Sequence, residues 1–159
     1  MNVPIRVSLF SVLMLTASAL CADGAVNFRV ELSGDQEVPA PVDTAAHGVA
    51  ILHVNQALTE IRFRLVVDGA DNILGAAGAH LHCAPAGVNG PVVVFLAGSA
   101  PPGFSGRIEM RATLGDDSIL NPACGENIAE LVGSMLDGNV YINVHSMDHP
   151  GGEVRGQIN

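Results

Sequence analysis

Residues 139–146 read NVYINVHS, and apolar and polar side chains alternate along this stretch. Because successive side chains of a β-strand point to opposite faces, residues two apart share one face. The two faces are formed by Val140, Ile142 and Val144 on one side and by Tyr141, Asn143 and His145 on the other. The stretch therefore predicts a strand that buries its apolar face and presents a histidine on the opposite one.

The same period of two recurs along most of the chain after residue 26. Some stretches alternate strictly, and others are short apolar runs between Gly- and Pro-rich turns, which also indicate strands. The expected strands are 28–32, 48–55, 60–67, 79–83, 91–96, 104–114, 139–146 and 152–158. Many short strands with turns between them favour an all-β fold, either an antiparallel sandwich of two sheets or a barrel.

One short helix is expected among these strands. Its apolar residues follow the i, i+3, i+4, i+7, i+8 spacing of a buried helical stripe. They are Ile128, Leu131, Val132, Met135 and Leu136. Asn127 is suited to cap the first turn with Glu130 as capping-box partner, and Gly138 is suited to left-handed backbone after the last turn.

The composition indicates one packed and acidic domain. A length of 159 residues suits a single domain, and 48% of the residues are hydrophobic against 14% charged. Seven arginines face sixteen acids, there is no lysine, and the formal net charge is -9. Such a surface repels phosphate backbones, so nucleic acid is not an expected partner.

The N-terminal segment has the pattern of a secretory signal. Residues 7–20, VSLFSVLMLTASAL, are apolar but too few to span a membrane, and Arg6 precedes them. Cleavage is expected after Ala22, or after Ala19. The pattern predicts an exported protein, periplasmic or secreted, and no later stretch approaches the ~18 apolar residues of a membrane span.

The expected export determines how the cysteines are interpreted. With 1–22 as signal peptide and 23–159 as the domain, Cys83 and Cys124 remain. An even pair in an oxidising compartment favours a disulfide, which would stabilise the fold by roughly 3–4 kcal/mol. A copper thiolate at Cys83 is the alternative, although that side chain faces away from the adjacent histidine. Lipid anchoring through Cys21 is a minor alternative, because the residues before it match that signal poorly.

Four histidines are candidate metal ligands: His80, His82, His145 and His149. His80 and His82 lie two apart in one expected strand, so both point to its polar face, as His145 does in its own strand. If the two strands are neighbours, these rings converge, and His149, or else His47, could add a fourth ligand. Such a set suits copper or zinc. The alternative is that these are half-exposed histidines bonded to backbone or water.

Simpler roles are expected for other polar residues. Glu37 and Asp148 are expected to be solvated acids, and Arg155 is expected to form an ion pair near an edge of the sheet. Gly151 and Gly152 are expected to form a tight turn that needs positive φ.

Five motifs, in order along the chain, carry a family resemblance. They are GDQEVP at 34–39, AHLH at 79–82, GVNGPVV at 87–93, GNVYINVHS at 138–146 and PGGEVRGQ at 150–157. Together they resemble the CHRD (chordin-repeat) domain family over nearly the whole expected mature chain, and the last motif is the most specific. The resemblance implies an all-β extracellular or periplasmic domain.

The histidine pair and the later Val144-His145 are also loosely similar to copper/zinc superoxide dismutase, which is a β-sandwich too. The long metal-binding loop of that enzyme is not found, and residues 83–144 contain no histidine, so a two-metal site is not expected. A strongly negative net charge also opposes the steering of an anion such as superoxide.

Three functions are expected, in descending order. The first is an exported binding module that holds one transition metal ion, copper before zinc, at the histidine cluster. The second is an interaction module without metal, whose partner would be another exported or surface protein. The third is a dismutase-like redox enzyme.

Overall fold

The computed structural model describes residues 25–74, 78–96 and 103–159. Its strands are β1 (Asn27–Ser33), β2 (His47–Val54), β3 (Ile61–Ile73), β4 (Ala79–Cys83), β5 (Val92–Phe95), β6 (Phe104–Leu114), β7 (Val140–Val144) and β8 (Val154–Ile158). One α-helix, α1, spans Ile128–Leu136, and the 3-10 turns are η1 (Gly34–Gln36), η3 (Asp116–Ser118) and η4 (Pro122–Cys124). The expected all-β class with one short helix is confirmed.

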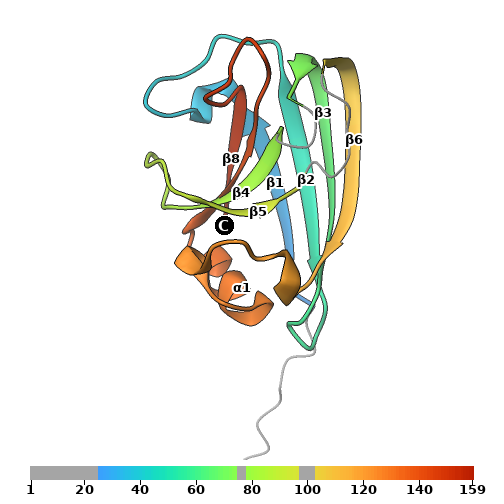
Figure 1. Ribbon diagram of the computed structural model, residues 1–159, viewed down its shortest axis with the longest axis vertical. Helices are drawn as coiled ribbons and strands as arrows, with labels where there is room; N and C mark the ends of the chain where they lie inside the picture. Colours follow the sequence, from blue (N-terminus) through green and yellow to red (C-terminus); the bar gives the residue numbers. More distant parts are fainter. Residues whose placement is uncertain (1–24, 75–77, 97–102) are drawn as a thin grey trace, which may run out of the picture.

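The eight strands form a single antiparallel sheet, in the order β5-β4-β7-β8-β1-β2-β3-β6. The sheet curls into a half-barrel, and α1 lies at one end of it (Figure 1). Of the two architectures expected, the curled sheet is nearer to a barrel than to two separate sheets. Strands β4 and β7, which carry the histidine motifs, are direct neighbours, with β8 next to β7.

The apolar faces predicted by the alternation fill the inside of the curl. Phe28, Val30 and Leu32 of β1 are each at most 5% exposed, and Val140, Ile142 and Val144 of β7 are at most 1% exposed. The helix adds Ile128, Leu131, Val132 and Met135 to the same core. Leu136 was expected in this stripe, but as the last residue of the helix it is 61% exposed and does not join the core.

The two ends of α1 match the caps expected from the sequence in part. The side chain of Asn127 accepts a hydrogen bond from the Glu130 N–H at 3.0 Å, which confirms the cap. The Glu130 carboxylate accepts from the N–H of Glu126 at 2.9 Å rather than from that of Asn127, so the expected capping box is displaced by one residue. Gly138 has φ +69, as expected for the residue that ends the helix.

Strand β3 runs six residues beyond its expected end at 67, because two irregularities in its pairing with β6 let it continue past Gly69. Its far end then meets the segment that follows β7. Ile73 bridges Ser146, the Leu74 N–H donates to the His145 carbonyl oxygen at 3.2 Å, and the Met147 N–H donates to that of Asn72 at 2.9 Å. These contacts tie the curl together beside His145.

Candidate metal centre

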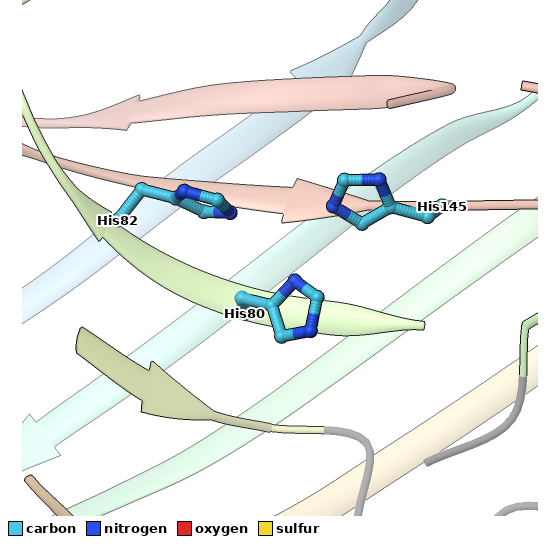
Figure 2. A group of neighbouring side chains, drawn as sticks. All are labelled: His80, His82 and His145. Carbon is cyan, nitrogen blue, oxygen red and sulfur yellow. The ribbon is translucent and has the colours of Figure 1, made fainter. Parts of the chain in front are cut away.

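Pairing between β4 and β7 places three histidines on the outer face of the sheet. The register sets His80 opposite Asn143 and His82 opposite Tyr141, and His145 follows the last residue of β7. The ring centroid of His80 lies 5.5 Å from that of His82 and 5.0 Å from that of His145. Figure 2 shows the three rings turned toward one another. The two segments therefore bring their histidines together, as expected from the sequence.

The three rings offer nitrogen atoms that lie within 4.8 Å of one another. The side chains are largely buried, at 8% exposure for His80 and 9% for both His82 and His145. Nδ1 of His80 and Nε2 of the other two are buried and make no hydrogen bond to any residue that the structure describes. Buried nitrogens without partners are costly unless they bind something, so this cluster is the leading candidate for a ligand site.

Hydrogen bonds to backbone carbonyls fix which nitrogen of two rings is free to bind. Nδ1 of His82 lies 2.9 Å from the Gly90 carbonyl oxygen, and Nδ1 of His145 lies 3.1 Å from that of Pro150. Because a carbonyl only accepts, each Nδ1 carries the hydrogen and each Nε2 keeps its lone pair. Protein metal sites commonly orient their histidine ligands in this way.

Burial favours the neutral form of all three imidazoles, because it lowers the pKa of each ring. Burial, followed by the nearby His145 and His82, lowers the pKa of His80 from 6.5 to about 4. Burial also lowers the pKa of His82 and that of His145, against the opposing effect of their carbonyl hydrogen bonds. Neutral imidazole is the form that binds a metal ion.

Aromatic rings surround the cluster. The Tyr141 ring stacks on His82 with centroids 4.8 Å apart and planes 10° apart, and its hydroxyl oxygen accepts from the Gly90 N–H at 3.3 Å. The Phe95 ring meets His80 edge-on at 4.8 Å and is 50% exposed. Gly90 thus contacts both His82 and Tyr141, and Phe95 contacts His80 while remaining half exposed.

Arg155 departs from its expected role. It lies on β8, between β7 and β1 in the sheet, and is 1% exposed. Its guanidinium donates to the Val88 carbonyl oxygen at 2.9 Å and to Oδ1 of Asn89 at 3.2 Å, and it lies 3.5 Å from the centroid of the Tyr141 ring. No described carboxylate lies within ion-pairing distance of it. The prediction that Arg155 forms an ion pair near a sheet edge is therefore wrong. The loop of residues 84–90 covers this part of the sheet and supplies the partners of Arg155.

Glu37 is likewise not the solvated acid that was expected. It follows η1 and is 6% exposed, and its Oε2 accepts a long hydrogen bond of 3.4 Å from the Asn143 amide. Burial raises its pKa from 4.5 to about 7, against the lowering effects of Arg155 and Asn143. Gly152, which has φ +135, makes room for this contact, since a Cβ there would lie 2.6 Å from Oε2 of Glu37.

Glu37→Gln is expected to make stability less dependent on pH. Because the folded-state pKa lies above the unfolded one, the wild type binds more protons when folded and loses stability as pH rises from about 4.5 to 7. The full loss, up to about 3 kcal/mol, persists above pH 7. Urea unfolding at pH 4 and pH 8 should show the glutamine variant to be the more stable at pH 8 only. A wild type whose stability does not fall over this interval would contradict the raised pKa.

The fourth candidate ligand, His149, is not a member of the cluster. It lies in the turn after β7, where its N–H donates to the Ser146 hydroxyl oxygen at 3.0 Å. His47, the other suggestion, is exposed on β2, with Nδ1 3.1 Å from the Ala45 carbonyl oxygen. The described part of the chain therefore gathers three of the suggested ligands.

The structure pairs Cys83 with Cys124, with Cα atoms 5.5 Å apart. Cys83 immediately follows His82 in β4 and so points to the other face of the sheet. A Cys83 thiolate is therefore not available to the histidine cluster. The disulfide ties the end of β4 to η4, close to the start of α1.

The sequence alone missed the parts played by Gly90, Tyr141 and Glu37. Tyr141 was placed on the correct face, but its stacking on His82 depends on the register of two strands that are distant in the sequence. The only local signal for Gly90 is a glycine within a Gly- and Pro-rich turn, and Glu37 carries no local signal of burial.

The proposed signal peptide lies outside the described residues. Within residues 25–74, 78–96 and 103–159, no helix is long and apolar enough to span a bilayer. No curated protein and no solved structure shows a significant match to this chain. Residues 28–158, by contrast, match the CHRD domain, which is typically extracellular or periplasmic. The chain therefore belongs to the CHRD domain family.

Proposed function

We propose that this CHRD domain is an exported module that binds one transition metal ion, copper before zinc, through His80, His82 and His145. Two observations carry the proposal: each of the three rings has a buried nitrogen without a hydrogen-bond partner, and the three rings offer ligand nitrogens within 4.8 Å of one another. The carbonyl contacts of two rings already point the lone pairs into the cluster.

The geometry requires only a small closure of the rings. An ion at about 2.0 Å from three coplanar imidazole nitrogens sets those nitrogens about 3.5 Å apart. The present separations of up to 4.8 Å are about 1.3 Å longer, so metal binding would require the rings to close by that amount. Imidazole nitrogens suit copper and zinc among the biological metals, which agrees with the expectation from the sequence.

Export is part of the proposal. It is supported by the apolar segment at 7–20, by the family and by the Cys83–Cys124 pair, since disulfides persist in oxidising compartments. The periplasm or the exterior of the cell is the proposed location, and metal uptake would take place there.

The test is metal titration of the purified protein, wild type against the double variant His80→Ala/His82→Ala. The double variant is expected to bind copper at least 100-fold more weakly, because loss of supporting contacts alone costs 10–100-fold and here two ligands are removed. Competition with a chromophoric chelator measures the affinity. Circular dichroism should show that the variant remains folded.

Two single variants complete the experiment, the first as a matched control and the second as a test of the fourth candidate ligand. His53→Ala removes an exposed histidine of β2 whose Nδ1 contacts Oδ1 of Asn27, and it should leave copper affinity unchanged. His149→Ala asks directly whether the fourth candidate takes part. If the double variant binds copper as tightly as the wild type, the metal proposal fails and an interaction module without metal remains.

A further inference from the structure

The donor set of the proposed site carries no negative charge. Among the residues that the structure describes, the group able to hold an ion consists of three histidines, with no carboxylate or thiolate. Cys83 is engaged in the disulfide, and imidazole binds a metal ion in its uncharged form. The full charge of a bound ion would therefore have to be accommodated by the surroundings.

Those surroundings disfavour positive charge. The three side chains are at most 9% exposed, so solvent screens a bound ion weakly. The cost of transferring an ion from water to such a site grows with the square of its charge, so a divalent ion is penalised about fourfold more than a monovalent one.

A fixed cation stands behind one ligand. Arg155 lies 3.5 Å from the Tyr141 ring centroid, and that ring stacks on His82, so guanidinium, phenol and imidazole form one stack. The guanidinium charge therefore faces the cluster through one ring, and no described carboxylate lies within ion-pairing distance of Arg155 to neutralise it. Glu37, the acid that interacts with Arg155, is itself largely protonated below pH 7.

The number of donors fits an ion of low charge as well. Zinc takes a fourth ligand in addition to three protein histidines, and Cu(II) prefers a tetragonal set of four or more. Cu(I) is satisfied by three nitrogens in a plane. Because imidazole by itself binds all three ions, charge and coordination number are what distinguish them here.

We infer that the His80, His82 and His145 site takes copper as the monovalent ion, in preference to Cu(II) and Zn(II), because its donors are neutral, its rings are buried and Arg155 supplies a fixed positive charge behind them. This inference rests on the proposed function and adds to it the oxidation state of the ligand. Arg155 accounts for a preference on the order of tenfold at an effective dielectric of about 20.

The test measures three affinities of the metal-free wild-type protein. Cu(I) is supplied anaerobically as its acetonitrile complex with ascorbate, so that no thiol reductant cleaves the Cys83–Cys124 bond. Cu(II) and Zn(II) are titrated separately against chelators of known affinity. Cu(I) is expected to bind at least 100-fold more tightly than either divalent ion. Equal or tighter binding of Cu(II) or Zn(II) would overturn the inference and leave metal binding intact, whereas failure to bind any of the three would overturn the proposed function itself.

A substitution beside the site tests the role of charge without disturbing Arg155. Phe95 is half exposed and contacts His80, so Phe95→Glu adds a carboxylate at the cluster in a position that remains solvated. Relative to Phe95→Gln, it should raise Cu(II) affinity about tenfold but Cu(I) affinity only about threefold, because the attraction to the added carboxylate scales with the charge of the ion. Leu120→Glu, at a residue 58% exposed outside the cluster, is the control for net charge. If Phe95→Glu raises Cu(II) affinity no more than Leu120→Glu does, the electrostatic basis of the inference is overturned.

Discussion

Gly90→Ala is expected to lower the free energy of unfolding by about 3–5 kcal/mol, near the upper end for a single added methyl group. A Cβ at residue 90 would overlap the carbonyl oxygen of Cys83 and would lie 2.9 Å from the Cβ of Ala84. The overlapped group is backbone of β4, where the Cys83 N–H is bonded to the Pro91 carbonyl oxygen at 3.0 Å. Relief of the overlap requires the β4–β5 connection to move.

Gly90→Ala should also weaken metal binding, because the carbonyl of residue 90 orients His82 and its N–H donates to the Tyr141 hydroxyl oxygen. Urea unfolding and copper titration measure the two effects. Gly87→Ala in the same connection is the control: nothing lies within 4 Å of its added Cβ, and only its φ of +77 opposes the change, at about 1 kcal/mol. If both variants are equally stable, the close approach between residue 90 and the Cys83 carbonyl oxygen does not limit stability.

The double variant Cys83→Ala/Cys124→Ala is expected to lose roughly 3–4 kcal/mol of stability. The bond closes a loop with a sequence separation of 41, and its removal restores that conformational freedom to the unfolded chain. Alanine is preferred to serine, because Cys124 is 5% exposed and a buried hydroxyl would add a cost of its own. Denaturant unfolding of the variant, and of wild type reduced with dithiothreitol, should give similar losses.

Copper affinity separates this effect from damage to the histidine cluster. Because the Cys83 side chain lies on the other face of β4, the double alanine variant should bind copper as the wild type does at temperatures where it stays folded. A large loss of affinity would mean that the disulfide, rather than the pairing of β4 with β7, holds His82 in place.

The period of two was sufficient to predict the strands and the faces of their side chains. It placed His80 and His82 together and set His145 on the matching face of its own strand. The sequence could not predict that those strands are neighbours, because sheet order depends on contacts between segments about 60 residues apart. The assumption of adjacency held, and the order β4-β7-β8 brings the motifs into one area.

Predictions failed where loops cover the polar face of the sheet. Glu37 and Arg155 were assigned to solvent because charged residues on an outer face usually reach it. Here the segment after η1 and the turn at 84–90 pack over that face, and Asn89 links them by donating to the Val38 carbonyl oxygen at 3.0 Å. Such a third layer leaves no periodic signal, since its residues are held by single hydrogen bonds rather than by an apolar stripe.

The paired cysteines determine how a metal in the histidine cluster would be detected. With both sulfurs covalently engaged, copper in the cluster would have only nitrogen donors, and the intense visible absorption that a thiolate gives to oxidised copper would be missing. A filled d-shell, as in monovalent copper or in zinc, absorbs no visible light and gives no paramagnetic resonance. Protein loaded with Cu(I) or zinc is therefore expected to be colourless, and its metal content has to be measured by elemental quantification.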